Sequence, residues 1–408
     1  MKVAVVGAGI GGLCLAQGLL KAGVDVTVYE RDASLDSRGQ GYRLHLDAGP
    51  ALHACLPPDL YELCVATSGR PSTSMSVVTE RLRTLRHNEI NPPADPYDPA
   101  TLSTSVNRRT FREILAARLG SVIEFGRTCT GFEQDAGSVR IHFADGSAAE
   151  ADVLVAADGV GSPIRQQYLP HAQVEDTGSV SVFGRTLLTE QTRNLVPTHT
   201  WDGFTAVIGA RIGMAIGVLD FREPPPDAAA RIAPDVRLNP AQPYLMWGAT
   251  GNARHFAVRS GESLGALGPA ALHATVLATI RRWHPGLVRL VELAEIEETC
   301  VVTIRTATQI DLWPSSRVTL LGDAIHAMSP AGGSGANTAL RDAALLATHL
   351  GAAARGEQPL VEAIAEYERQ MVDYGFAAVR ASRAAGLATT SLRGQLVRRL
   401  ISRLPASR

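Results

Sequence analysis

A glycine-rich turn near the N-terminus constrains the fold more than any other feature. Residues 3–6 form a short, β-branched apolar run of strand length, and Gly7-x-Gly9-x-x-Gly12 follows directly. An apolar-periodic stretch predicts a helix next, and a second strand ends at Glu30. In such a unit the glycines allow a tight turn, the approach of a pyrophosphate and close helix packing, while a carboxylate about 20 residues on can bind a ribose diol. We therefore predict a dinucleotide site, with an empty glycine-rich turn as the alternative; the motif alone does not distinguish NAD from FAD.

Composition limits the classes of protein that fit. The 408 residues are enough for two or three packed modules, and 45% hydrophobic with 19% charged residues is typical of a globular protein with a large core. The net charge of −1 gives no reason to expect nucleic acid as a partner. The five cysteines show no metal-ligand spacing, so we expect reduced thiols, no metal site and a cytoplasmic location. No run reaches the roughly 18 apolar residues of a transmembrane segment.

Two further turns resemble the first in chemistry. Residues 151–157 predict a buried strand that ends at Asp158-Gly159, and residues 317–321 predict another that ends at Gly322-Asp323. The loop after the second turn, through Asn337, opens a long helix. Between these turns, residues 122–125, 129–133 and 139–143 predict a small antiparallel meander with a hairpin turn at residues 145–146. Runs at 179–188, 205–212, 214–221, 244–249 and 255–259 predict a second domain rich in strands.

The three turns, in this order, resemble those of the FAD-dependent aromatic hydroxylases, the single-component flavin monooxygenases of the para-hydroxybenzoate hydroxylase type. The sequence looks most similar to members that hydroxylate polyketides and antibiotics, including tetracycline-inactivating monooxygenases. The resemblance implies an α/β fold: a glutathione-reductase-type FAD-binding Rossmann domain with an inserted β-sheet substrate domain and C-terminal helices. The expected FAD-binding domain comprises residues 1–75, 101–175 and 301–390, and the expected substrate domain residues 76–100 and 176–300. Residues 391–408 are expected to be a basic helix or tail.

The resemblance also implies roles for individual residues. Asp323 would bind the ribityl chain of FAD, and Arg108 would contact the flavin, with Arg109 as the register alternative. Asp158 would line the cofactor site, although a helix cap is its alternative role. Arg38 would face flavin or nicotinamide unless it is an ordinary surface arginine, and His326 is expected to be structural. The expected cofactor-binding residues are Gly7, Gly9, Gly12, Glu30, Arg31, Arg38, Arg108, Asp158, Asp323, Pro330, Gly333, Gly335, Ala336 and Asn337.

The expected chemistry follows from the same resemblance. FAD would be bound non-covalently, and NAD(P)H would dock transiently because the chain has no second G-x-G-x-x-G. The substrate would be an aromatic or polyketide-like small molecule, hydroxylated with O₂ through a flavin C4a-hydroperoxide, in a monomer or homodimer. No protein side chain is expected to be a certain catalytic residue, because the cofactor performs the chemistry. Candidate substrate residues are His45, Arg185, Trp201, Phe204, Arg211, Met214, Met246 and Trp247.

Three other functions are compatible with parts of this pattern. Flavin-dependent halogenation needs a suitably placed lysine and a Trp-x-Trp-x-Ile-Pro stretch, whereas the only lysines are Lys2 and Lys21 and the tryptophans are isolated. An isoprenoid-type flavin reductase would use the same cofactor domain without oxygen. A binding protein without working flavin would have little reason to keep Glu30, Asp323 and every glycine of the fingerprint.

Overall fold

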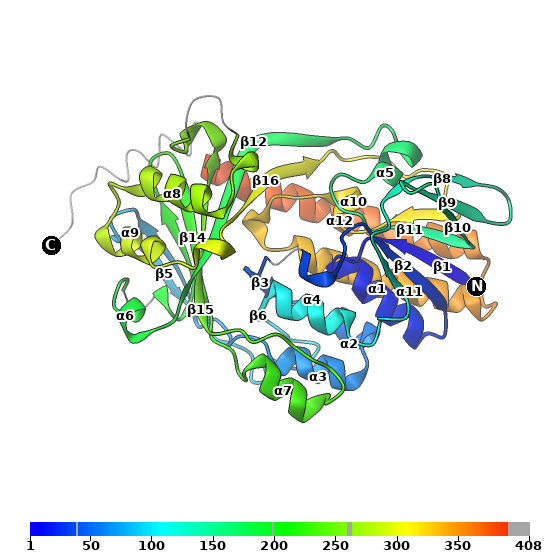
Figure 1. Ribbon diagram of the computed structural model, residues 1–408, viewed down its shortest axis with the longest axis horizontal. Coiled ribbons are helices and arrows are strands. Elements are labelled where there is room, and N and C mark those ends of the chain that lie inside the picture. Colours follow the sequence, from blue (N-terminus) through cyan, green and yellow to red (C-terminus); the bar gives the residue numbers. More distant parts are fainter. Residues whose placement is uncertain (38–39, 198–199, 259–262, 391–408) are drawn as a thin grey trace.

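The turns lie at one edge of a five-stranded parallel sheet in the computed structural model, which describes all residues except 38–39, 198–199, 259–262 and 391–408 (Figure 1). The strand order is β17-β11-β1-β2-β7. The strands are β1 (Lys2–Val6), β2 (Asp25–Glu30), β7 (Ile123–Phe125), β11 (Val153–Ala156) and β17 (Val318–Leu320). Because parallel strands end at the same edge, the turns after β1, β11 and β17 are neighbours. The predicted Rossmann-type sheet is confirmed.

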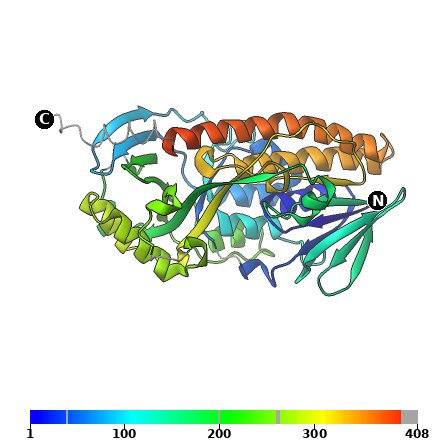
Figure 2. The same cartoon turned by 90° about the horizontal axis from the view of Figure 1, so that it is seen from above.

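Helices and a small sheet bury this parallel sheet, and residues 3–5 of β1 are at most 1% exposed. Helix α1 (Ile10–Lys21) packs on α11 (Gly335–Ala354), and α11 packs in turn on the long C-terminal helix α12 (Leu360–Thr390). Figure 2 shows α12, orange to red, extending from beside the parallel sheet towards the larger sheet, where it contacts β15 and β16. Further helices are α2 (Gly49–Cys55), α3 (Pro58–Ala66), α4 (Arg108–Ala116), α5 (Pro163–Tyr168), α6 (Glu190–Arg193), α7 (Pro225–Ile232) and α10 (Asp323–His326). None of the described helices is long and apolar enough to cross a membrane.

The predicted meander is displaced by one strand. Its members are β8 (Cys129–Gln134), β9 (Val139–Phe143) and β10 (Ala148–Ala151), with the predicted turn at Gly146 in the left-handed region at φ +83°. Residues 123–125 form β7 instead, which pairs in parallel with β2. Gly126, at φ +73°, follows directly and separates β7 from the meander. A three-residue strand carries too little periodicity to show which sheet it joins.

A seven-stranded sheet forms the second part of the molecule, in the order β16-β12-β15-β14-β13-β4-β5. Its strands are β4 (Ser74–Thr79), β5 (Thr84–Glu89), β12 (Val174–Leu187), β13 (Gly203–Ile208), β14 (Gly213–Leu219), β15 (Tyr244–Asn252) and β16 (Cys300–Ala307). All neighbours are antiparallel except β13 and β4. The predicted strand at 255–259 is wrong: residues 253–255 form a 3₁₀ turn and residues 256–258 are irregular.

The two faces of this large sheet have different neighbours. Helices α8 (Pro269–Ile280) and α9 (Pro285–Glu292) cover one face, where Leu245 and Trp247 of β15 belong to their hydrophobic core. Successive residues of a strand point to opposite faces, so Tyr244 and Met246 lie on the other side. That side meets the two-stranded ribbon of β3 (Arg43–Leu46) and β6 (Thr104–Asn107), which lies between the two sheets (Figure 1).

A buried carboxylate holds together the segments that follow β17. Asp342 of α11 accepts hydrogen bonds from the backbone N–H of Gly322 at 2.8 Å, from His326 Nε2 at 2.7 Å and from the Tyr374 hydroxyl at 2.6 Å. Asp342 and His326 are fully buried. Burial alone would lower the pKa of His326, but the Asp342 carboxylate raises it above its usual value. The Gly322-Asp323 turn, α11 and α12 therefore share one acceptor.

We predict that Asp342→Asn destabilises the fold strongly. An amide cannot accept all of these bonds, and each buried donor left unpaired costs about 1–3 kcal/mol. Urea unfolding should show the loss, with Asp373→Asn, an exposed position on α12, as the matched control. Equal free energies of unfolding for the two variants would contradict a shared structural role for Asp342.

Candidate functional site

The glycine-rich turn after β1 is packed tightly everywhere except at its tip. Gly7 has φ +111°, and a Cβ atom there would lie 2.3 Å from the carbonyl oxygen of Ala157. A Cβ atom at Gly12 would lie 2.1 Å from the carbonyl oxygen of Gly7. Nothing lies within 4 Å of the corresponding position at Gly9, which begins α1. The turn therefore presents Gly9 and the first N–H groups of α1 to a ligand.

Glu30 closes this unit at the end of β2, where it is only 7% exposed. Its Oε2 accepts a hydrogen bond from the N–H of Ala8 at 2.8 Å, and its Oε1 accepts one from Asp32 at 3.0 Å. Arg112 of α4 donates from Nε to the carbonyl oxygen of Ala8 at 2.9 Å. The Ala8 segment is thus held on both sides, and sequence analysis missed Arg112, which no local motif marks. Arg31 points to solvent, 3.8 Å from Asp32.

Asp158 follows β11 and lies beside the glycine turn, with its Cα 3.0 Å from where a Cβ atom of Gly7 would be. Both of its carboxylate oxygens are buried and form no hydrogen bond with the described residues. Burial raises the pKa of Asp158 to about 6. The alternative role as a helix cap is wrong, because Ser162 caps α5 by accepting from the N–H of Arg165 at 2.9 Å. Asp158 is therefore an acceptor without a protein partner.

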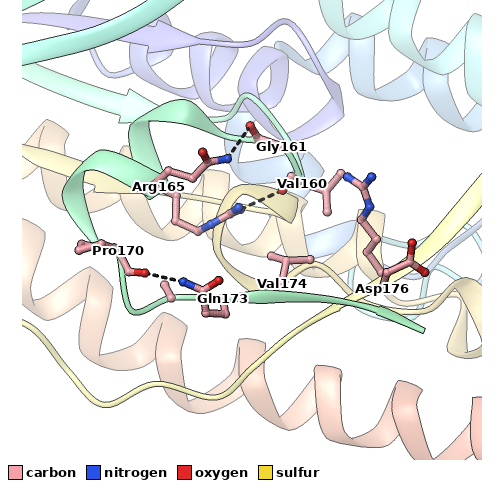
Figure 3. A pocket seen from close by; sticks show the side chains of 10 residues that line it. Val160, Gly161, Arg165, Pro170, Gln173, Val174 and Asp176 are labelled. Atoms are coloured by element: carbon pink, nitrogen blue, oxygen red, sulfur yellow. Dashed lines mark hydrogen bonds between the residues drawn. The ribbon is translucent and has the colours of Figure 1, made fainter. Parts of the chain in front are cut away.

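Arg165 joins the turn after β11 to the turn after β17. Its Nη1 donates to the carbonyl oxygens of Val160 at 3.1 Å and Ala324 at 2.9 Å. The residue is 4% exposed, and sequence analysis did not identify it. Figure 3 shows Arg165 at the side of a cavity of about 550 Å³, with its guanidinium directed to Val160. None of the predicted cofactor or substrate residues is among the residues that line this cavity.

Asp323 and Arg108 approach the same region from α10 and α4. Solvent reaches Asp323, yet the protein around it is close enough that desolvation raises its pKa, while His326 and Arg108 oppose that rise. Arg108 lies 5.6 Å from the centre of the Tyr42 ring, and its Nη1 is buried with no hydrogen-bond partner among the described residues. Arg109 binds Glu298 at 3.0 Å. Arg108, rather than its neighbour, is therefore the arginine that has donors to offer a ligand here.

The loop before α11 completes the group. Pro330 begins an exposed 3₁₀ turn, and Gly333 adopts the left-handed region at φ +64°. The N–H of Thr338 is bonded to Ser334, so the N–H groups of residues 335–337 precede the first regular helical bond. The side chain of Asn337 binds the backbone of β3 instead, donating to the carbonyl oxygen of His45 at 3.1 Å and accepting from the N–H of Asp47 at 3.0 Å. Asn337 thus fixes α11 against β3.

The predicted substrate residues do not gather at one place. Met214 and Trp247 are buried in the core under α8 and α9, so their predicted contact with substrate is wrong. Trp201 packs against the same core and donates from Nε1 to the carbonyl oxygen of Val196 at 3.3 Å. Arg211 is exposed in the turn between β13 and β14. Arg38 lies outside the described residues.

The other face of the large sheet carries the remaining candidates. Phe204, Gly217, Met246 and Arg185 are paired in register across β13, β14, β15 and β12, so their side chains share one face. Phe204 is 36% exposed, and the next row contains the small, half-buried residues Ala206 and Ala215. Arg185 is ion-paired with Glu295 at 2.7 Å and with Glu298 at 3.2 Å. We call Phe204, Ala206, Ala215, Gly217 and Met246 the candidate substrate face.

We predict that Asp158 makes stability depend on pH in protein freed of cofactor. Because its pKa is raised from 3.8 to about 6, the folded state binds more protons in this range, and the free energy of unfolding falls as the pH rises. The effect is at most about 3 kcal/mol, at about 1.36 kcal/mol per pKa unit. Urea unfolding at pH 4 to 8 should show the full fall in wild type and in Asp311→Asn, an exposed control. The fall should be smaller in Asp158→Asn, where Glu368, whose pKa burial raises to about 7, still contributes. Parallel curves for all three proteins would contradict this assignment.

Comparison with known proteins agrees with this arrangement. Residues 5–64 match the model of an NAD(P)-binding Rossmann-like domain, and residues 248–382 match that of an FAD-binding domain. A dual O-methyltransferase/FAD-dependent monooxygenase from Cercospora beticola is 33% identical over 90% of this chain, but the chain covers only 44% of that protein. The 6-hydroxynicotinate 3-monooxygenase of Bordetella bronchiseptica is 27% identical over 85% of this chain and 81% of its own length.

A solved structure covers almost the entire chain. A protein from Photorhabdus luminescens, assigned as an FAD-containing monooxygenase, matches with a TM-score of 0.78 and 33% identity over 95% of this chain and 98% of its own. The chain belongs to the family of FAD-dependent monooxygenases.

Proposed function

We propose that this protein uses NAD(P)H and O₂ to hydroxylate an aromatic or polyketide-like small molecule, with FAD bound along the edge formed by the turns after β1, β11 and β17. One observation carries the proposal: polar groups without protein partners converge on that edge. They are both oxygens of Asp158 and Nη1 of Arg108. A buried polar group without a partner costs free energy, so such groups indicate a ligand that satisfies them.

The residues present fit FAD. Gly9 and the start of α1 would receive the pyrophosphate, and Glu30 would accept from the adenosine ribose while keeping its bond to Ala8. Asp323 would bind the ribityl hydroxyls, and Arg108 would donate to the flavin. The N–H groups at the start of α11 would favour negative charge on the flavin ring edge. When bound, FAD supplies the acceptor for hydride from NAD(P)H and the activation of oxygen.

The protein's own contribution is to hold, orient and shield. Asp342 fixes the Gly322-Asp323 turn relative to α11, and Asn337 fixes α11 relative to β3. The candidate substrate face offers exposed Phe204 and small Ala206 and Ala215, where an aromatic ring would pack and displace water. Halogenation has no support, since Lys21 donates to the carbonyl oxygens of His53 and Leu56 and Lys2 begins β1. The division into domains, a monomeric or homodimeric state and a cytoplasmic location remain predictions.

We predict that Asp323→Ala weakens FAD binding about ten- to a hundredfold, because a charge-assisted hydrogen bond contributes about 1.5–3 kcal/mol. Fluorescence titration of the FAD-free protein measures the change. Asp311→Ala, at an exposed position away from the site, is the matched control, and circular dichroism checks that both variants are folded. Wild-type affinity in a folded Asp323→Ala protein would remove Asp323 from the cofactor site.

We further predict that one atom of labelled dioxygen enters the product, and that a true substrate lowers the release of hydrogen peroxide. Shielding by the substrate face is the reason for the second effect, since water at the site favours uncoupled oxidation. Mass spectrometry of the product and a peroxide assay measure the two quantities. Product oxygen that derives from water, or equal turnover without oxygen, would favour a flavin reductase instead.

A further inference from the structure

Arg43, the first residue of β3, is a desolvated cation without an acidic partner. Its Nε donates to the carbonyl oxygen of Val218 at 3.0 Å, and no carboxylate among the described residues forms an ion pair with it. Burial lowers the pKa of Arg43 to about 10, while Tyr244 opposes that change. Arg43 therefore stays protonated at neutral pH. Since a desolvated charge is costly unless it is paired, this position is prepared for an anion.

The neighbouring arginines differ from Arg43 in this respect. Arg185 is paired with Glu295 and Glu298, and Arg109 is paired with Glu298. Arg108 lies against Tyr42 and serves the proposed cofactor site. Of the arginines described around β3 and β6, Arg43 is thus the one that neither an acid nor the proposed FAD site accounts for.

Arg43 lies against the candidate substrate face. A Cβ atom at Gly217 would be 3.1 Å from its Cδ, 3.4 Å from its Nε and 3.5 Å from its Nη1. The absence of a side chain at Gly217 therefore lets the guanidinium lie flat on β14. Gly217 is paired in register with Phe204 on one side and Met246 on the other, so apolar side chains flank the cation within a single row.

Strand β3, which carries Arg43, also carries a residue that lies beside the proposed flavin site. His45, two residues along and on the same side of β3, has its Cβ 3.7 Å from where a Cβ atom of Gly333 would be. Burial lowers the pKa of His45, and Arg43 adds to that effect while Asp47 opposes it. A neutral imidazole can donate or accept but offers no competing charge. β3 therefore places Arg43 on the substrate face and His45 beside the loop that opens α11.

We propose that Arg43 binds a carboxylate of the substrate and holds the attached ring beside exposed Phe204, on the side of the guanidinium that faces away from Gly217. This inference rests on the proposed function, since it takes the substrate to lie between the large sheet and FAD. It names the substrate class more narrowly: an acidic aromatic compound rather than a neutral one. A guanidinium can bind a carboxylate with two N–H groups, which fixes the ring's orientation as well as its position.

The test compares acids with their neutral esters on the FAD-loaded enzyme. The probes are 4-hydroxybenzoate and 4,5-dihydroxyanthraquinone-2-carboxylate, each beside its methyl ester, and binding is read from the flavin absorbance and by calorimetry. We expect wild type to bind at least one acid about ten- to a hundredfold tighter than its ester. Arg43→Met should abolish the preference and Arg43→Lys should keep part of it. Arg289→Met, which breaks an exposed pair with Glu292 on α9, should behave as wild type.

Two results would overturn the inference: no acid preference in wild type with either pair, or the same preference in Arg43→Met. Failure of the proposed function is distinguishable, because FAD content and NAD(P)H oxidation by wild type are measured first. A wild type that takes up no FAD contradicts the proposed function itself. An FAD-loaded, NAD(P)H-oxidising wild type without acid preference contradicts only the role of Arg43.

Discussion

The buried carboxylate of Asp342 is the interaction on which the cofactor edge depends. Asp342 accepts from Gly322, His326 and Tyr374, which belong to the turn after β17, the helix α10 and the helix α12. These segments are far apart in sequence from the glycine turn that begins the fold, and neither propensity nor packing alone would set their relative positions. A shared acceptor does so with directional bonds in a site of low dielectric, where such bonds are strong.

The polar groups of the site fall into two sets with opposite properties. Glu30, Asp342 and Asn337 are satisfied by backbone or side-chain partners and hold the turns in place. Asp158 and Arg108 keep atoms without partners, which is unfavourable for the protein alone. Rigid surroundings are what allow the second set to persist, because a flexible turn would rearrange to satisfy them. The hydrogen bonds of the first set thus stabilise the folded protein, whereas the unpartnered atoms of the second set destabilise it.

Sequence reasoning reached the parallel sheet and its three turns, because each turn carries glycines and an acid at a fixed distance from an apolar strand. The cofactor-binding roles of the residues on these turns stay predictions. Sequence reasoning also selected Arg108 and Asp323 through the resemblance. It missed Arg112, Arg165 and Asp342. Arg112 and Arg165 each bind a carbonyl oxygen more than a hundred residues away, and the partners of Asp342 lie 16 to 32 residues away on other elements. No local pattern marks such contacts.

The substrate residues were harder to predict for a geometric reason. Residue type suggested Trp247 and Met246 equally, but a strand turns neighbours to opposite faces, and only the register of β15 shows which face each residue joins. The misplaced strand β7 has a similar cause, since its partner β2 is nearly a hundred residues away. Strand pairing joins residues that are far apart in the sequence, whereas residue type and periodicity are properties of short segments.

Successive residues of β14 and β15 face opposite sides of the large sheet and are therefore constrained by different neighbours. Leu245 and Trp247 fill the core under α8 and α9, so smaller side chains at these positions would leave a cavity and destabilise the fold. Met246 and Gly217 lie on the opposite face, outside that core, where Met246 packs in a second cluster with Tyr244 and Gly217 leaves room for Arg43. The exposed and half-buried positions of this face, Phe204, Ala206 and Ala215, can therefore take other side chains and change what the sheet binds while both buried clusters stay intact.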